Sequence, residues 1–207
     1  MTIKDLGQLS EMHIDVLKEI GNIGAGNAAT SLAQMLGRKV EMTTPVVRVL
    51  DIADADRALG GPETPVVAIL VELYGDIKGI MMFVLGNDFA KSLLKSLLGE
   101  EDVDCLHLSE MESSAMSEIG NIMIGAYTAA IGSLAGLTIK ISVPAVTADM
   151  VGSLLTVPAA EMGSVSDKII FIEDDFINAS DKITSNMMLI PHLESLNKLM
   201  NSLGIDL

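Results

Sequence analysis

The 207-residue sequence predicts a mixed αβ fold made of two copies of one unit, related by a pseudo-twofold axis, with an antiparallel sheet flanked by long helices. Three observations predict it: segments of sequence recur at one fixed spacing, each copy opens with a long helical pattern, and short apolar strand patterns follow each helix. A hydrophobic content of 49% is ample for a packed core. We therefore expect a single domain over residues 1–207, with repeats over about 9–99 and 108–204.

The repeat is visible when the sequence is shifted by 99 positions. Leu9–Met12 then overlies Leu108–Met111, and Glu19–Ile23 overlies Glu118–Ile122. The same shift carries Gly26 to Gly125, Gly37 to Gly136 and Pro45 to Pro144. So many identities at one offset indicate an internal duplication.

The first copy begins with a long helical pattern from Ser10 to Gly37, with Ser10 as its N-cap and Glu11 in its first turn. A turn signal at Gly60–Pro62 and a second turn at Gly75–Lys78 separate the strands that follow. We expect strands over Lys39–Leu50, Val66–Tyr74 and Gly79–Leu85, the last two as an antiparallel hairpin, and a closing amphipathic helix over Asp88–Leu98.

The second copy repeats this order. Ser109 and Glu112 form the sequence signature of a capping box at the start of its helix. We expect strands over Thr138–Thr147, Lys168–Ile177 and Ile183–Ile190, and a closing helix over Leu193–Leu203. The acidic run Glu173–Asp175 makes the second of these strands less regular. Because no Pro-, Gly- or Ser-rich linker joins the copies, we expect them to share one sheet or one core.

Composition excludes several classes of function. A net charge of −15 repels phosphate backbones and anionic membrane surfaces, so nucleic-acid binding is disfavoured and a basic partner is favoured. Cys105 is the single cysteine and cannot form an internal disulfide, and the N-terminus lacks the pattern of a signal peptide. These features predict a cytoplasmic protein.

Three further signals are interpreted as structural. Ile119–Ile139 contains no charged residue, but we expect a buried helix running into a strand there and no membrane insertion. His13, His107 and His192 are widely separated, so no metal site is expected. Cys105 has no neighbouring pattern that would activate its thiol.

A polar stripe on each long helix is the candidate site. Asp15, Glu19 and Asn22 lie at positions i, i+4 and i+7, which places them on one face of an α-helix. Ser114, Glu118 and Asn121 have the same spacing in the second copy. Glycines around each Asn lower helix stability and usually permit a close approach of another backbone.

Each copy contains Asp or Ser, then Glu, Asn and Pro at one spacing: Asp15, Glu19, Asn22 and Pro45, then Ser114, Glu118, Asn121 and Pro144. This pattern resembles the CheC, CheX and FliY family of chemotaxis phosphatases, over essentially the whole chain. The duplication, with both sites intact and no additional flagellar-switch domain, is most similar to the CheC type.

The resemblance implies hydrolysis of the aspartyl phosphate on CheY, the chemotaxis response regulator. It assigns Asn22 and Asn121 to orienting the attacking water, and Glu19 and Glu118 to pairing with the receiver's lysine. Asp15 and Ser114 would support the helix face or touch the partner, and Pro45 and Pro144 would shape the adjoining strand. No cofactor of the chain's own is implied, because the divalent cation belongs to the receiver.

Two alternatives remain open at this point. Proteins similar to CheC also bind CheD, a receptor-modifying deamidase, so the chain could be a largely non-catalytic module that regulates CheD or sequesters phosphorylated CheY. A structural component of the flagellar switch is the third reading. The two asparagines distinguish these readings, because only an enzyme loses its function when both carboxamides are removed.

Overall fold

The computed structural model describes residues 3–99, 103–162, 168–178 and 181–205. Its elements, in chain order, are η1 (Leu6–Gln8), α1 (Glu11–Leu36), β1 (Glu41–Met42), β2 (Val46–Asp51), α2 (Ile52–Ala58), β3 (Pro65–Gly75), β4 (Gly79–Gly86), α3 (Asn87–Leu98), α4 (Glu110–Ala135), β5 (Ile139–Ile141), β6 (Ala145–Met150), α5 (Val151–Leu154), α6 (Thr156–Met162), β7 (Lys168–Asn178), β8 (Asp181–Pro191) and α7 (Leu193–Ser202).

All eight strands belong to one antiparallel sheet with the order β1-β7-β8-β4-β3-β5. At its two sides β2 also pairs with β7, and β6 also pairs with β3. Each edge strand therefore pairs with the hairpin of the other half of the chain. Exchanging every strand for its counterpart in the other half reverses the order and leaves all neighbours unchanged.

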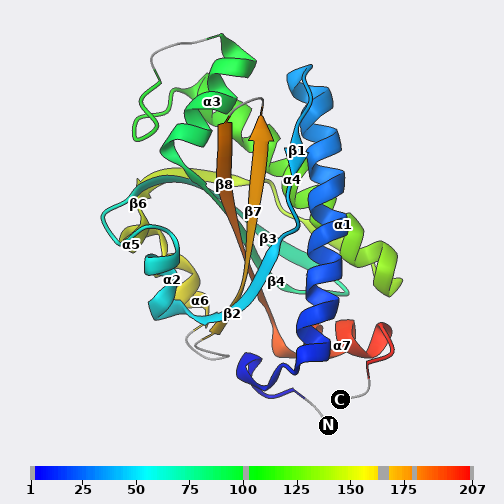
Figure 1. Cartoon of the computed structure of the whole chain (residues 1–207). Coiled ribbons are helices and arrows are strands. Elements are labelled where there is room, and N and C mark those ends of the chain that lie inside the picture. The colour runs from blue at the N-terminus through cyan, green and yellow to red at the C-terminus, as the bar shows by residue number, and fades with distance from the viewer. Residues whose placement is uncertain (1–2, 100–102, 163–167, 179–180, 206–207) are drawn as a thin grey trace.

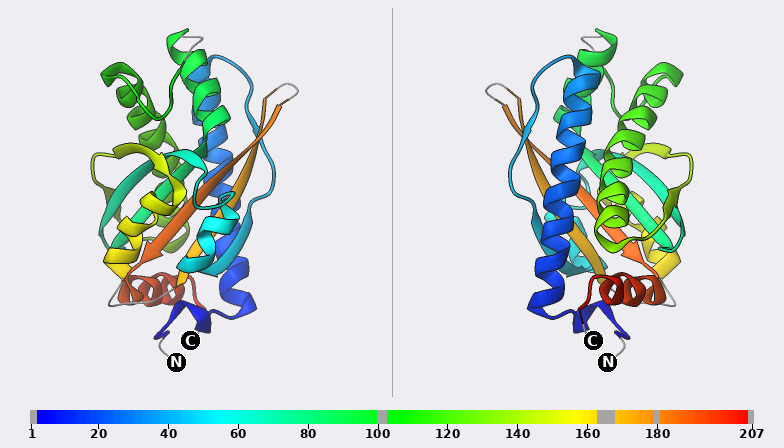
Figure 2. Two further views of the ribbon diagram at one scale, coloured as in Figure 1. Left: turned by 90° about the vertical axis from the view of Figure 1, so that its left-hand side faces the viewer. Right: turned by 90° about the vertical axis from the view of Figure 1, so that its right-hand side faces the viewer.

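Helices cover both faces of the sheet. α1 and α4 lie side by side on one face and run in opposite directions, while α3 and α7 pack at the two ends of that face (Figures 1 and 2). The larger apolar core lies between these helices and the sheet, and it includes Leu17, Ile20, Ile119 and Tyr127. The short helices α2 and α5 cover a smaller core on the opposite face.

The predicted hairpin is confirmed, since β3 and β4 pair from Val66↔Gly86 to Leu73↔Gly79. β7 is continuous through Glu173–Asp175, so the acidic run does not interrupt it. Both closing helices lie where the sequence predicted them, as α3 and α7.

The predicted strand over Lys39–Leu50 is wrong as one element, because it divides into β1 and β2 on either side of Pro45. Three residues, 43–45, lie opposite two on β7, which is a β-bulge. The predicted strand over Thr138–Thr147 divides in the same way around Pro144, opposite β3. Proline has no N–H to donate to a strand ladder, so it occurs at such irregular positions.

Both long helices begin and end where the sequence signals predicted. The N-terminal cap of α1 differs from that of α4, because a histidine takes the place of the glutamate. Ser109 N donates to Glu112 Oε2 at 2.6 Å, and Glu112 N donates to Ser109 Oγ at 3.3 Å, which is the predicted capping box. At α1 the equivalent partner is His13, whose Nδ1 accepts the Ser10 N–H at 3.0 Å. Gly37 and Gly136 end the two helices in the left-handed conformation.

Sequence patterns did not predict α2, α5 or α6, which are short and lie in the connections between strands. Among the described residues, no helix is long and apolar enough to cross a membrane.

Candidate functional site

The four predicted catalytic side chains are exposed on the outer surface of α1 and α4. Glu19 and Asn22 are exposed on α1. Leu17, two residues before Glu19, and Ile20, the residue after it, are buried against the sheet. Glu118 and Asn121 are exposed on α4 in the same way. Because the two helices are antiparallel neighbours, the two predicted stripes lie on the same side of the sheet.

Within the described parts of the chain, none of these four side chains makes a hydrogen bond or an ion pair. Each carboxamide therefore has its donor and acceptor groups available for a partner, and neither carboxylate has a cationic partner among the described residues. Polar groups held in this state on a rigid helix are suited to recognising a ligand that supplies the missing partners.

Glycines directly before each Asn seat the helices on the sheet. A Cβ at Gly21 would lie 3.3 Å from Pro45 Cγ, and one at Gly120 would overlap Ile69 Cγ2. Because these positions have no side chain, the helix backbone approaches the strands closely, and the next residue, Asn22 or Asn121, is directed outward.

The supporting residues have internal partners. Asp15 Oδ1 accepts a hydrogen bond from Lys18 Nζ at 2.8 Å, and Ser114 Oγ donates to the Glu110 carbonyl at 2.8 Å. Pro45 and Pro144 are buried in the two bulges. This geometry favours support of the helix face as the role of Asp15 and Ser114.

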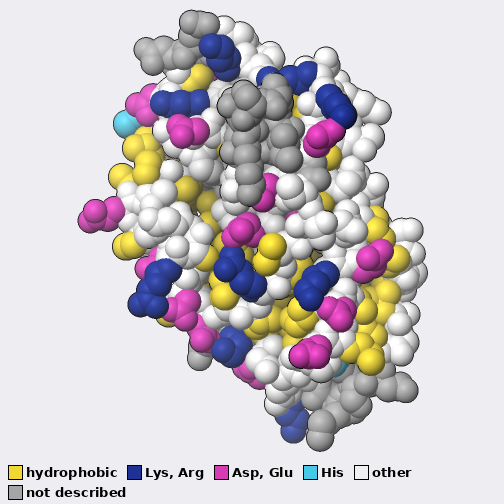
Figure 3. Space-filling model, viewed as in Figure 1, with side chains coloured by type: hydrophobic (Ala, Val, Ile, Leu, Met, Phe, Trp, Pro, Cys, Tyr) yellow, Lys and Arg dark blue, Asp and Glu magenta, His cyan; other side chains and the backbone are white. Residues whose placement is uncertain are grey.

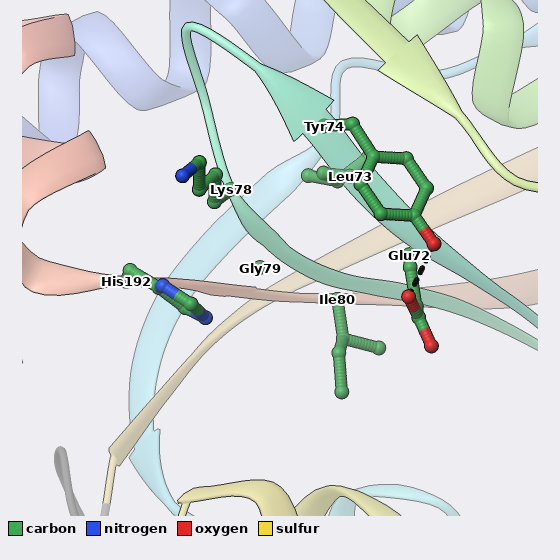
Figure 4. A pocket seen from close by; sticks show the side chains of 7 residues that line it. All are labelled: Glu72, Leu73, Tyr74, Lys78, Gly79, Ile80 and His192. Carbon is green, nitrogen blue, oxygen red and sulfur yellow. Dashed lines mark hydrogen bonds between the residues drawn. The ribbon is translucent and has the colours of Figure 1, made fainter.

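Three of the surface hollows are lined by described residues. One hollow, of about 220 Å³, lies beside the β3–β4 turn, where the Tyr74 hydroxyl donates to Glu72 and where Ile80 and His192 also form part of the lining (Figure 4). The others lie beside Val47 and beside Lys198. None of these three is lined by Glu19, Asn22, Glu118 or Asn121, which are exposed on the two helices.

Charge is distributed over the surface without one dominant patch on the face seen in Figure 3, where Lys and Arg side chains alternate with Asp and Glu. Arg48 and Glu173, for example, form a surface ion pair at 2.7 Å. The chain as a whole is acidic, with a net charge of −15, and Glu19 and Glu118 add exposed carboxylates to its surface.

The histidines and Cys105 lie apart from the sites. His13 is buried in the α1 cap, His107 contacts Asp104 at 2.8 Å, and His192 precedes α7. Cys105 is buried, and burial raises the pKa of its thiol, which lowers its reactivity. The sequence did not single out a buried polar pair beneath the helices, in which the Tyr127 hydroxyl donates to Asp174.

Comparison with known proteins gives two adjacent family matches. The model of the CheC-like family matches residues 12–49, which contain the first copy of the motif. The model of the chemotaxis phosphatase CheX matches residues 67–161, which contain the second.

Individual relatives agree with these matches. The CheY-P phosphatase CheC of Bacillus subtilis (strain 168) is 34% identical over 203 residues, covering 96% of this chain and 97% of that protein. The flagellar motor switch phosphatase FliY of the same organism is 33% identical over 145 residues, covering 70% of this chain and 38% of that protein. The crystal structure of Thermotoga maritima FliY shares the fold, with a TM-score of 0.76 at 24% identity over 95% of this chain and 98% of that chain. The chain belongs to the CheC-like family of chemotaxis phosphatases.

Proposed function

We propose that this chain is a phosphatase that hydrolyses the aspartyl phosphate of the response regulator CheY, and that α1 and α4 each carry one working site. The observation that carries the proposal is the pair of exposed Glu and Asn side chains at identical spacing on both helices, which have no polar partner among the described residues. The near full-length similarity to a CheY-P phosphatase supports the same substrate.

The reaction needs little covalent chemistry from the enzyme. Water attacks phosphorus, an O–P bond forms, and the bond between phosphorus and the aspartyl oxygen breaks, which releases inorganic phosphate and a free carboxylate. Because an acyl phosphate is already activated, the main requirement is a water held in line with the breaking bond. The carboxamides of Asn22 and Asn121 suit this task, since they accept and donate hydrogen bonds without titrating near neutral pH.

Glu19 and Glu118 fix the docking register in this proposal. Each lies three residues before its Asn, and thus on the same stripe of the helix. A carboxylate without a cation of its own attracts the lysine of the receiver's active site, and that contact brings the phosphoryl group to the neighbouring carboxamide. The divalent cation is contributed by the receiver, and no residue of this chain is assigned to it.

The duplication itself is part of the proposal. We propose that residues 1–207 form one domain of two repeats related by a pseudo-twofold axis. The repeated element order, the reversible strand order and the two equivalent bulges support it. Since each edge strand pairs with the other repeat's hairpin, neither repeat completes its own sheet alone.

A cytoplasmic location and a second partner, the deamidase CheD, complete the proposal. Family membership supports both, since chemotaxis receivers and CheD act on the same signalling system. We expect CheD to alter the rate of CheY dephosphorylation without contacting Asn22 or Asn121.

The decisive experiment follows the decay of phosphorylated CheY with wild type, Asn22→Ala, Asn121→Ala and the double variant, each with and without CheD. We expect wild type to accelerate decay, each single variant to retain part of the activity, and the double variant to lose it while still binding CheY. If wild type does not accelerate the decay of phosphorylated CheY under any condition, the chain is a binding module and not a phosphatase.

A further inference from the structure

Glycines inside α1 and α4 fall into two groups. A Cβ at three of them would collide with a neighbour: at Gly24 it would lie 2.6 Å from Tyr127 Cδ1, at Gly132 it would lie 2.8 Å from the Leu137 carbonyl oxygen, and at Gly120 it would overlap Ile69 Cγ2. Gly21 and Gly120 seat the helices on the sheet, as described above. Close packing within the molecule explains all of these.

Gly26 and Gly125 have no such explanation. A Cβ built at either position has no atom within 4 Å apart from its chain neighbours and the backbone of its own helix, and neither residue has a positive φ. Glycine in the interior of a helix costs about 0.5–1 kcal/mol relative to alanine. The chain carries this cost at two positions that are 99 residues apart and that each follow the site Asn by four residues.

Hydrogen bonds to the carbonyl groups of Gly26 and Gly125 do not explain why glycine occurs at these positions either. The Gly26 carbonyl accepts a bond from Thr30 Oγ1 at 2.9 Å, and the Gly125 carbonyl accepts one from Thr128 Oγ1 at 3.1 Å. Both bonds use the main chain of the glycine, so an alanine at the same position would keep them.

The direction of helical side chains links these glycines to the sites. In an α-helix the Cα–Cβ bond tilts toward the N-terminus, so a side chain covers the surface over the preceding turn. A side chain at position 26 would therefore cover the surface beside Asn22, and one at position 125 the surface beside Asn121.

We propose that Gly26 and Gly125 are positioning residues that keep the space beside each site carboxamide open, so that the rim of the receiver's active site can reach the helix backbone there. The inference rests on the proposed function and deepens it. It states that the receiver docks over the turn between Asn and Gly, with the phosphoryl group and the attacking water against the Asn side chain.

The test uses the full chain with both glycines replaced, as Gly26→Ala/Gly125→Ala and as Gly26→Leu/Gly125→Leu. The matched control is Asn27→Ala/Ser133→Ala, which raises helix propensity at exposed positions that lie off the site stripe. For each variant, three quantities are measured: the kinetics of phosphorylated CheY decay, the affinity for beryllofluoride-activated CheY, and the midpoint of urea unfolding.

We expect the Leu variant to lose on the order of 100-fold in kcat/KM, with a smaller loss for the Ala variant, because the reacting groups are displaced by the added side chain. Affinity for activated CheY falls in the same order, while stability is equal to or above that of wild type. The control keeps both activity and affinity.

Three results would overturn the inference. If wild type is active and the Leu variant matches it in kcat/KM and affinity, the space is not used, although the proposed function stands. If wild type binds activated CheY without hydrolysing it and the Leu variant binds equally well, the inference fails together with the proposed phosphatase activity. If wild type neither binds nor hydrolyses, the inference and the proposed function both fail.

Discussion

The Tyr127 hydroxyl on α4 donates a hydrogen bond to the Asp174 carboxylate on β7, and both side chains are buried between the helices and the sheet. The Tyr127 ring also fills the space over Gly24 of α1 and lies 6.2 Å from the Phe83 ring. This one side chain therefore joins both site-bearing helices to the sheet. The residue 99 positions before Tyr127 is Ala28, so the pair occurs in one half of the chain.

Asp174→Asn should make stability less dependent on pH. Burial is the main cause that raises the pKa of Asp174 to about 7, and nearby Asp175 and Glu173 add to it, while the Tyr127 hydrogen bond opposes it. The unfolded carboxyl ionises near its ordinary value of 3.8, so the folded state holds a proton that the unfolded state has lost between about pH 4 and pH 7. Wild-type stability attributable to this group thus falls as pH rises through that window, by at most about 4 kcal/mol.

Urea unfolding of wild type and Asp174→Asn at pH 5 and pH 8 measures this effect, because contributions from all other groups cancel in the difference. The variant should gain relative stability at pH 8. Asp149→Asn is the control: Ser153 lowers the pKa of this exposed carboxyl, so it is ionised in both states across the window and its difference should be flat. Parallel pH profiles for wild type and Asp174→Asn would show that Asp174 is ionised in the folded protein throughout.

Gly24→Ala should destabilise the protein, in contrast to Gly26→Ala two residues later. The added methyl at position 24 meets a buried Tyr127 ring that is held by its bond to Asp174, and overpacking of this kind typically costs about 1–3 kcal/mol. At position 26 the methyl meets nothing and improves helix propensity. Chemical denaturation should give shifts of opposite sign, and shifts of the same sign would mean that packing does not distinguish the two positions.

Local patterns in the sequence predicted the two long helices, their caps, the β3–β4 hairpin and the outward stripe that carries Glu19 and Asn22. These depend on periodicity and on neighbouring residues. The pairing of β2 with β7, and of β6 with β3, joins segments more than 70 residues apart, and no local pattern encodes that choice.

Other features were missed because their partners are distant in sequence or their elements are short. Asp174 was interpreted as a weak point in a strand, whereas the strand continues and its carboxyl is paired with a tyrosine 47 positions away. α5, with four residues, is too short for a helical period to be recognised. The bulges at Pro45 and Pro144 could have been predicted, since a proline inside a strand pattern indicates an irregular or edge position.

Ser109→Ala should cost about 1 kcal/mol of stability, because Ser109 Oγ accepts the Glu112 N–H at the start of α4. Ser133→Ala, an exposed interior position of the same helix, is the control and should not destabilise. Thermal unfolding compares the two variants. An equal effect of both would mean that the cap bond contributes nothing beyond helix propensity.

Glu19→Gln/Glu118→Gln should weaken the association with phosphorylated CheY and make it less sensitive to salt. The substitution removes the charge and retains the size of the side chain, so the loss reports the electrostatic part of docking. Measurement of KM and kcat at low and high ionic strength should show a raised KM and a smaller salt effect, with kcat altered less. Glu63→Gln, an exposed carboxylate in the α2–β3 loop, should behave as wild type. A salt dependence that is unchanged in the double variant would remove these glutamates from the docking contact.

Met12 and Met111 should anchor the partner at the end of each site opposite the open glycine. Both are 63% exposed, they occupy equivalent positions, and each lies seven residues, or two helical turns, before the site Glu on the same stripe. A flexible apolar side chain at such a position suits contact with a partner's surface. Met12→Ala/Met111→Ala should therefore raise KM for phosphorylated CheY by roughly 3- to 10-fold, since about 1 kcal/mol of apolar contact is lost. Leu134→Ala, an exposed apolar residue near the other end of α4 and off the stripe, should leave KM unchanged. If Met12→Ala/Met111→Ala and Leu134→Ala have equal KM values, the methionines do not contact CheY. The docking contact is then confined to the helix turns between the site Glu and the open glycine.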